Sequence, residues 1–403
     1  MKFTAWGTAA HERRYEWQVL LILSFVNGIV ALDRLAVNFL SPYFFGPLGL
    51  TNAQLGLLSS ALSASIAVFG FLIANAADRT GRQKAILVWV LIAFSLLSAG
   101  AGVATGFVTL FMARFALGAS EGPLVPLTQT LMHSASPPAR RGFNMGTMQI
   151  AGAFAIGAML GPPIMVHLAE TLGWRIAFFV SAVPGLIGAA LVAMVLRDPR
   201  KEVPALTAPP LPPIRSLLRS RNLLLSMAIA ALFTAWLTIQ NVFMPRYLTD
   251  TLGFSKPVMG WMLGLAGLGG LVGGVLIPAL SDRFGRRTMV IAAGFCSILT
   301  PLALLYVTHS AVLLALLLMV GWLTIGCAPL VCAIIPAETV PLSRTTTAVA
   351  LSMCTAELFG GVLSPPLAGW AADIWGLRAP FYLDIALALA CGGLGLALKK
   401  GER

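Results

Sequence analysis

The chain has 403 residues, of which 58% are hydrophobic and only 10% are charged. A soluble domain of this length does not need so much apolar surface, so the composition excludes a soluble globular protein. The net charge of +12 would suit nucleic acid, but the basic residues are spread over short loops between apolar segments. No single basic groove can form from that distribution, so we expect an integral membrane protein that does not bind nucleic acid.

About twelve apolar segments follow one another along the chain, each long enough to cross a hydrocarbon core about 30 Å thick as a helix. They are expected near 18–40, 53–76, 85–104, 107–131, 144–168, 176–196, 222–245, 258–280, 288–308, 311–336, 346–370 and 379–398. The predicted fold class is therefore an all-α integral membrane protein with about twelve transmembrane helices in two pseudo-symmetric six-helix bundles.

The first and fourth segments carry ionisable residues inside the predicted membrane. Asp33 and Arg34 are adjacent, whereas Arg114 and Glu121 are seven residues apart and share one helix face, about 10 Å apart along the axis. Such a group costs roughly 2.5–3.5 kcal/mol on insertion scales, so each needs a reason. Structural ion pairs are one reading, but buried pairs stabilise poorly. We expect both pairs to meet in a central cavity.

A charged loop motif occurs twice, after the second and after the eighth segment. Its residues are Asp78, Arg79, Gly81 and Arg82 in the first copy and Asp282, Arg283, Gly285 and Arg286 in the second. Asp78 and Asp282 are 204 positions apart, and a further echo at 203 positions relates Gly161-Pro162-Pro163 to Ser364-Pro365-Pro366. The chain is therefore built from two like halves, an architecture of alternating access. We expect the motif to latch the halves together.

The repeat and the basic residues define the expected organisation and topology. We expect an N-terminal six-helix bundle over 1–196, a proline-rich cytoplasmic linker over 197–221 and a C-terminal six-helix bundle over 222–403. Most of the 27 Lys and Arg fall in the loops that share a side with both termini. The positive-inside rule then places both termini in the cytoplasm.

The second half carries different polar residues from the first. Glu357 lies in the eleventh segment, and Asp384 lies in the twelfth. Gln149 in the fifth segment is expected either to bind substrate or to form an interhelical hydrogen bond. The five cysteines have no metal-ligand spacing, so we expect neither a metal nor a cofactor.

The repeated loop motif resembles the G-x-x-x-D-R-x-G-R-[RK] signature of the major facilitator superfamily. Ala74 and Pro278 stand where the first glycine of that signature would be. Arg114, Gly118 and Gly122 resemble the helix 4 signature of the same superfamily. The resemblance covers essentially the whole chain and implies a secondary transporter rather than an enzyme.

Within that superfamily, Asp33-Arg34 together with Arg114 and Glu121 is similar to the anion:cation symporter family of sugar-acid and organic-anion permeases. By resemblance, Asp33 and Glu121 match proton-coupling carboxylates, and Arg34 and Arg114 match substrate or gating arginines. Glu357 stands where that family often has a substrate-contacting asparagine, which puts a plain polyhydroxy acid in doubt. The resemblance implies a multi-pass protein of a bacterial inner membrane, acting as a monomer surrounded by lipid.

The cavity charges and the resemblance leave two alternative modes of transport. The first is proton-coupled symport of a small organic anion such as a carboxylate or sugar acid, with sodium as the other possible coupling ion. The second is a proton-coupled efflux antiporter or a spinster-like lipid carrier. Gly157-x-x-x-Gly161-Pro162 resembles part of the antiporter motif, but the following Gly pair is missing. Two arginines also suit anions better than cationic drugs, which favours symport.

Overall fold

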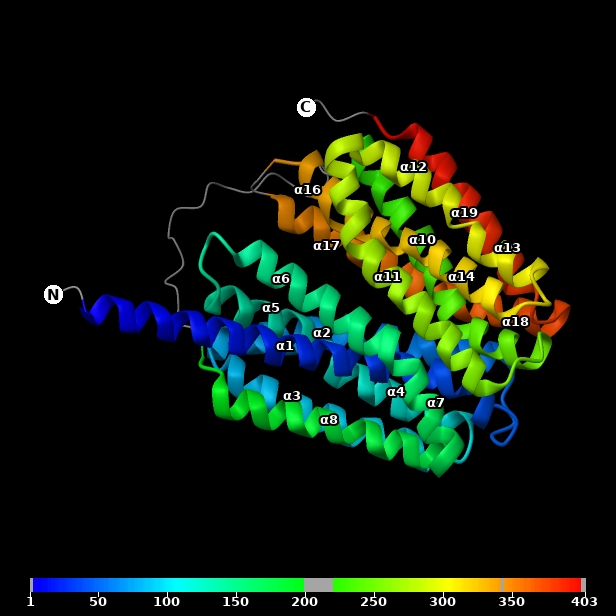
Figure 1. Ribbon diagram of the computed structural model, residues 1–403, viewed down its shortest axis with the longest axis horizontal. Coiled ribbons are helices and arrows are strands. Elements are labelled where there is room, and N and C mark those ends of the chain that lie inside the picture. The colour runs from blue at the N-terminus through cyan, green and yellow to red at the C-terminus, as the bar shows by residue number, and fades with distance from the viewer. Residues whose placement is uncertain (1–2, 199–219, 342–343, 400–403) are drawn as a thin grey trace.

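The computed structural model describes residues 3–198, 220–341 and 344–399. The predicted linker lies almost entirely outside these residues. The first half contains α1 (Phe3–Phe44), α2 (Asn52–Thr80), α3 (Gln83–Gly100), η1 (Ala101–Val103), α4 (Phe107–Glu121), α5 (Leu124–Ala135), α6 (Arg141–Ile150), η2 (Ala151–Leu160), α7 (Gly161–Leu172) and α8 (Trp174–Val195). Figure 1 shows these helices lying together in blue to green.

The second half repeats this pattern with more interrupted helices. It contains α10 (Arg221–Arg246), η3 (Tyr247–Thr251), α11 (Lys256–Phe284), α12 (Arg286–Cys296), α13 (Leu299–Tyr306), α14 (Ala311–Trp322), η4 (Leu323–Gly326), α15 (Cys327–Pro329), η5 (Leu330–Ile334), α16 (Ile335–Thr339), α17 (Thr345–Thr355), η7 (Ala356–Leu363), α18 (Ser364–Trp375) and α19 (Ala379–Ala397). These helices form the green-to-red group of Figure 1.

In the described residues, eleven helices are long and apolar enough to cross a membrane. The twelfth crossing is the pair α4 and α5, which is broken at Gly122 and Pro123. Proline has no backbone N–H and clashes with the preceding turn, so the continuous segment expected from the sequence becomes two shorter helices. The prediction of an all-α membrane protein with about twelve spanning helices is confirmed.

Two glycines of the repeated loop motif have the backbone geometry that the motif requires. Gly81 ends α2 with φ +67°, and Gly285 ends α11 with φ +91°. Residues with a side chain rarely adopt this left-handed region, whereas glycine does so at little cost. The motif glycines therefore set sharp turns at matching places in the two halves.

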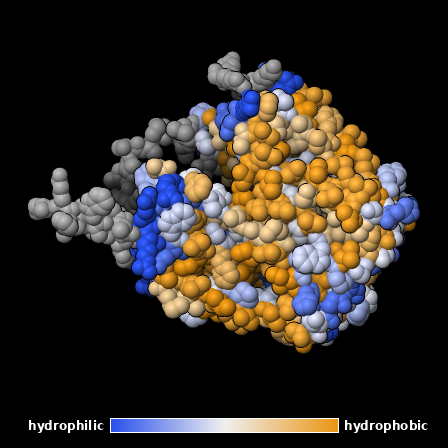
Figure 2. All heavy atoms as spheres, viewed as in Figure 1, coloured by the Kyte–Doolittle hydropathy of each residue, from blue (hydrophilic) through white to orange (hydrophobic). Residues whose placement is uncertain are grey.

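The outer surface is apolar over a broad band. Figure 2 shows hydrophobic residues covering most of the visible face, with hydrophilic groups gathered toward its edges. Large apolar side chains point outward, including Trp89 and Met194, which are 71% and 74% exposed. A soluble protein would not expose so many, whereas lipid solvates them without cost.

We name the two ends of the molecule by the predicted topology. The inner end holds the first turns of α1 and the last turns of α2 and α8, and the outer end holds the loops that join α1 to α2 and α18 to α19. At the outer end, α2 packs on α18 so tightly that a Cβ added to Gly56 would lie 2.3 Å from the Pro365 carbonyl oxygen. A Cβ on Gly267 of α11 would lie 2.2 Å from the Ala158 oxygen of η2. Only glycine permits these backbone contacts between the halves.

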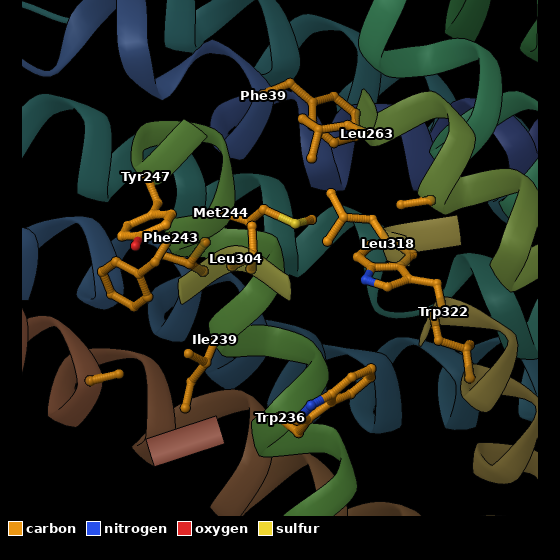
Figure 3. Packing of buried hydrophobic residues seen from close by; sticks show 14 of the residues in the cluster. Phe39, Trp236, Ile239, Phe243, Met244, Tyr247, Leu263, Leu304, Leu318 and Trp322 are labelled. Carbon is orange, nitrogen blue, oxygen red and sulfur yellow. The ribbon is translucent and has the colours of Figure 1, made fainter. Parts of the chain in front are cut away.

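The hydrophobic cores show the same asymmetry between the ends. One core is shared by both halves, and it joins Phe39 and Phe44 near the outer end of α1 to Phe243 and Leu263. Figure 3 shows part of it. A separate core, which includes Leu23 and the rest of the inner part of the first half, has members from that half alone. The halves are therefore packed together at the outer end, whereas the inner part of the first half has a core of its own.

Candidate functional site

A cavity of about 390 Å³ lies between the halves, lined by residues of both. Its charged lining side chains are Arg34 and Arg114 from the first half and Glu357 from the second. The volume is in the range of pockets that hold small molecules. Intramembrane charges gathered around such a space are the usual mark of a substrate pathway.

Arg34 connects this cavity to a buried carboxylate. Its Nε and Nη2 both donate to Glu121 Oε1 at 2.5 Å. The Arg34 side chain is 42% exposed, whereas that of Glu121 is 0% exposed, and Glu121 Oε2 has no hydrogen-bond partner. The guanidinium therefore has one side on a buried anion and the other side toward the cavity.

Arg114 is held differently, although it also lines the cavity. Its Nη2 donates to the backbone oxygen of Arg34 at 3.0 Å, and its Nη1 lies 3.5 Å from the backbone oxygen of Asp33. It is only 3% exposed, and its Nε has no partner. Arg114 interacts electrostatically with both Asp33 and Glu121. It is thus a buried positive charge between two carboxylates.

The expectation that Asp33 meets the others in the cavity is wrong. Asp33 is 2% exposed, does not line the cavity, and accepts hydrogen bonds at Oδ1 from Ser98 of α3 and Ser181 of α8. Successive residues of a helix are rotated by about 100°, so Asp33 must face away when Arg34 faces the cavity. Glu121 also lies behind the cavity wall, because Arg34 covers it.

The second half contributes Glu357 from the π-helix η7. A Cβ added to Gly361 would lie 2.8 Å from Glu357 Oε1 and 3.1 Å from Ser63 Oγ of the other half. The Glu357 carboxylate therefore lies over a glycine at the boundary between the halves, and it interacts electrostatically with Arg34. Gln149 lines the same cavity. The structure thus places Arg34, Arg114, Gln149 and Glu357 on the wall of one cavity, and their part in substrate binding stays a prediction.

Sequence reasoning missed two amide side chains of α1 that line the cavity. Asn27 and Asn38 lie on the same face as Ala31 and Arg34, with spacings of four, three and four residues along the chain. This is the helical period of one face of α1, so the spacing itself was a usable signal. Asn27 also lies within hydrogen-bond distance of Thr128 Oγ1, at 3.4 Å.

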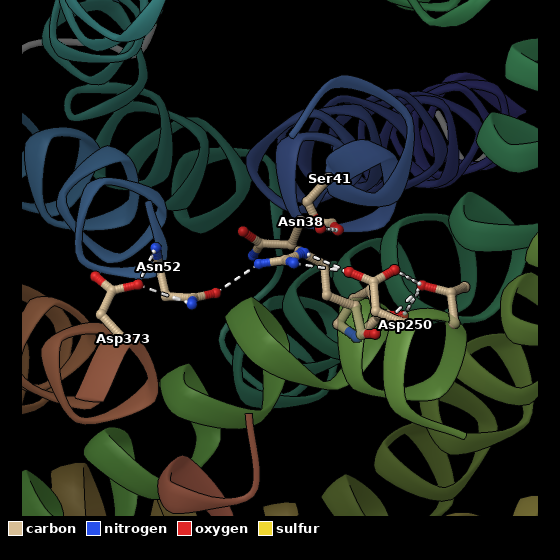
Figure 4. A network of polar contacts seen from close by, with 8 residues as sticks. Asn38, Ser41, Asn52, Asp250 and Asp373 are labelled. Carbon is tan, nitrogen blue, oxygen red and sulfur yellow. Dashed lines mark hydrogen bonds and ion pairs between the residues drawn. The ribbon is translucent and has the colours of Figure 1, made fainter. Parts of the chain in front are cut away.

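A polar network that the sequence did not predict joins the halves at the outer end. We call it the outer clasp and define it as Asn52, Arg246, Asp250 and Asp373 (Figure 4). Asp373 of α18 accepts hydrogen bonds from the backbone N–H of Asn52 at 2.8 Å, from its Nδ2 at 2.8 Å, and from the N–H of Ala53 at 2.9 Å. The carboxylate therefore caps the N-terminus of α2 from the opposite half.

Arg246 completes the clasp from α10. It donates to Asn52 Oδ1 and to Asp250 Oδ2, and its guanidinium carbon lies 3.3 Å from the centre of the Phe45 ring. Together with the shared core, these contacts close the cavity toward the outer end. In this conformation the halves meet at the end that we call outer.

The described ion pairs of the loop motif do not join the halves in this conformation. The side chains of Asp78 and Arg79 lie outside the described residues, and Arg82 is exposed. In the second copy, Arg286 pairs with Asp282 at 2.6 Å and with Glu338 of α16 at 3.2 Å. These pairs lie within one half. A latch between the halves at the inner end stays a prediction.

Two like helical halves around a charged cavity, closed at one end, define a membrane transporter of the alternating-access type. Comparison with known proteins agrees: the model of the Major Facilitator Superfamily matches residues 23–244 and 237–403. The chain belongs to this superfamily, and it is an integral multi-pass membrane protein and a transporter rather than an enzyme.

Among its relatives is the hexuronate transporter of Bacillus subtilis (strain 168), which is 28% identical over 69% of this chain and 70% of its own length. The cis,cis-muconate transport protein of Acinetobacter baylyi is 25% identical over 94% of this chain and 93% of its own. Both relatives are named for organic acids. A bacterial homologue of the human lysosomal transporter Spinster, solved in an inward-facing and occupied conformation, has the same fold with a TM-score of 0.75, 18% identity, and 95% and 97% coverage.

Proposed function

We propose that this transporter is a proton-coupled symporter of a small organic anion, either a carboxylate or a sugar acid. The observation that carries the proposal is the placement of Arg34, whose partly exposed guanidinium separates the cavity from the buried Glu121 carboxylate. A ligand carboxylate binds well to such a planar fork. The proposal is also supported by relatives named as transporters of hexuronate and muconate.

Charge balance supplies the coupling. Arg34 and Arg114 offer two positive charges, while Asp33, Glu121 and Glu357 offer up to three negative ones. A bound anion therefore adds to a negative excess unless carboxylates take up protons, because uncompensated charge is expensive in a low-dielectric site. Anion and proton binding then favour each other, which is a coupling free energy between two sites.

Glu121 is the first carboxylate to respond. Its Oε1 shares Arg34 with any carboxylate in the cavity, and its Oε2 has no partner. A substrate that draws Arg34 toward itself leaves Glu121 without its counter-charge, and protonation removes the resulting cost. Asp33 precedes Arg34 in the chain and lies beside Arg114. It is therefore the second proton site in this proposal.

The remaining cavity residues select the ligand. Glu357 and Gln149 lie on the cavity wall, where they bind groups of the substrate other than its carboxylate. A hydroxyl or amino group donates a hydrogen bond to Glu357, whereas a second carboxylate there is repelled. The proposal also includes the setting of the protein: it acts as a monomer in a bacterial inner membrane, with both termini in the cytoplasm. Its two six-helix bundles span 1–196 and 222–403 and are joined by the segment 197–221.

Efflux antiport or lipid transport is the second candidate, and Glu357 is the observation in its favour, because a cavity acid also binds cationic drugs. Uptake into proteoliposomes separates the two modes. With an inward proton gradient and a panel of uronates, muconate and monocarboxylates, symport predicts concentrative uptake of at least one acid that Arg34→Lys weakens. If no acid accumulates, and a cationic drug is taken up only with an outward proton gradient, the result would support antiport.

A further inference from the structure

Asp384 is a buried carboxylic acid that the proposed cycle does not use. It lies on α19 in the second half, and its exposed fraction is 0%. Neither of its side-chain oxygens has a hydrogen-bond partner. An ionised carboxylate in that state would have lost its water and gained nothing in exchange, which is strongly unfavourable, whereas the neutral acid loses far less.

A short chain of side chains connects Asp384 to the substrate cavity. Gln240 of α10, also fully buried, interacts with Asp384, although its Nε2 completes no hydrogen bond in this conformation. The Oε1 of Gln240 accepts a hydrogen bond of 2.8 Å from Trp322 Nε1. Trp322 in turn lines the cavity. In Figure 3 its indole reaches toward α10. A change at the cavity wall is therefore two contacts away from the acid.

The internal repeat gives Asp384 a counterpart in the first half. Ser181 and Asp384 are 203 positions apart, which is the repeat offset of this region. Ser181 of α8 donates to Asp33 of α1, and Asp384 of α19 lies beside Gln240 of α10. Each half thus holds one buried carboxylate between its first and last spanning helices, although the acid is on opposite helices of the two pairs.

Charged groups on the neighbouring helices are engaged elsewhere. On the helices that pack against α19 they are Arg221, exposed at the start of α10; Arg246, paired with Asp250; Asp373, in the outer clasp; Arg286, paired with Asp282 and Glu338; and Arg287, which donates at 2.7 Å to the Leu396 backbone oxygen, three turns inward of Asp384. Two titratable groups that are uncharged at neutral pH, a tyrosine and a cysteine, lie closer to Asp384 along the helix axis. Tyr247 contacts Phe381 edge to face one turn outward, with ring centres 4.7 Å apart, and buried Cys391 lies two turns inward. Neither of these two groups carries a positive charge that could pair with an Asp384 carboxylate.

We propose that Asp384 is a further proton-binding site, distinct from Glu121 and Asp33, which is occupied in this conformation and linked to the cavity through Gln240 and Trp322. When the outer end opens, water from the cavity reaches the acid along the path of Trp322 and Gln240. The O–H bond of the acid then breaks, the proton passes to water, and the carboxylate that remains accepts a hydrogen bond from Gln240 Nε2. The role of this proton in coupling rests on the proposed function, but the protonation itself does not.

Infrared spectroscopy of the purified full-length protein tests the protonation without any transport. The wild type is expected to show a carboxylic-acid C=O band that persists at pH values where exposed carboxyl groups are ionised. Asp384→Asn should remove that band, Asp384→Glu should move it, and Glu170→Gln, which changes an exposed acid of the first half, should leave it unchanged. A band that survives unaltered in both Asp384 variants would overturn the proposal, and the glutamate variant decides if the asparagine variant does not fold.

A second arm tests the link to the cavity. Trp322→Phe removes the N–H that polarises Gln240, and one buried hydrogen bond is worth about three- to tenfold in proton affinity. The pH at which the band disappears should therefore shift by about 0.5 to 1 unit. A band that titrates identically in this variant would refute the link. If anion uptake is observed, Asp384→Asn should lower the ratio of protons to anions; if no anion is taken up, the infrared result stands separately.

Discussion

Removing the Asp373 carboxylate is expected to open the outer end of the transporter. Asp373→Ala deletes three hydrogen bonds of 2.8–2.9 Å to Asn52 and Ala53, two of them to N–H groups in the first turn of α2. When the halves separate, these donors are hydrated instead, so only the net value of each bond counts. That value is about 0.5–1 kcal/mol per bond at a solvent-accessible site. The sum of roughly 1.5–3 kcal/mol corresponds to a shift of about 10- to 150-fold toward outward-open conformations.

Spin labels across the outer end measure this shift directly. Cysteines placed at Gly46 and Thr251, in a background without the native cysteines, report the distance between the halves by pulsed electron resonance. Glu170→Ala is the matched control, because its carboxylate accepts from Tyr43 at 2.6 Å within the same half. The Asp373 variant should gain a longer-distance population that the control lacks. Equal distributions in the wild type and the Asp373 variant would show that the clasp does not hold this end closed.

Four further substitutions test the arginines, the packing between the halves and the cavity acid. Arg34→Lys and Arg114→Lys keep the charge but lose the planar fork, so anion affinity by calorimetry should fall by about tenfold or more; wild-type affinity in both would remove the arginines from the substrate site. Gly267→Leu places a side chain where a Cβ already meets the Ala158 oxygen at 2.2 Å. It should stop outer closure in the same spin-label assay, and an unchanged closed population would contradict the packing. Glu357→Gln should change the preference between matched acids with and without an amino or hydroxyl group; an unchanged preference would exclude Glu357 from ligand selection.

Much of this fold could be predicted because a membrane restricts both composition and charge. Twelve apolar segments and a repeat at 203–204 positions specify the architecture, since only helices satisfy their backbone groups in lipid. Intramembrane charges are rare enough that Arg34, Arg114 and Glu357 could be picked out one by one, and all three line the cavity. The same rarity made Asp384 visible, but its neighbours come from helices whose contacts the sequence does not show.

The pairing of those charges could not be predicted from the sequence. Proximity along the chain suggested Asp33 with Arg34 and Arg114 with Glu121, whereas Arg34 pairs with Glu121 from another helix. Helix rotation and the crossing of α1 with α4 decide this, and both depend on packing. The outer clasp was missed for a different reason. Asn52 and Asp373 are ordinary polar loop and helix-end residues, and only the approach of the two halves gives them a shared role.

Proton-driven accumulation of an organic acid is the central claim, and one measurement tests it most directly. Purified protein in proteoliposomes is given an inward proton gradient and the radiolabelled acid to which it binds best, and uptake is compared with that of Glu121→Gln. We expect the wild type to concentrate the acid and to stop when the gradient is collapsed, whereas the variant still exchanges internal for external acid but does not accumulate it. Undiminished accumulation by Glu121→Gln, or wild-type accumulation that ignores the proton gradient, would contradict the account.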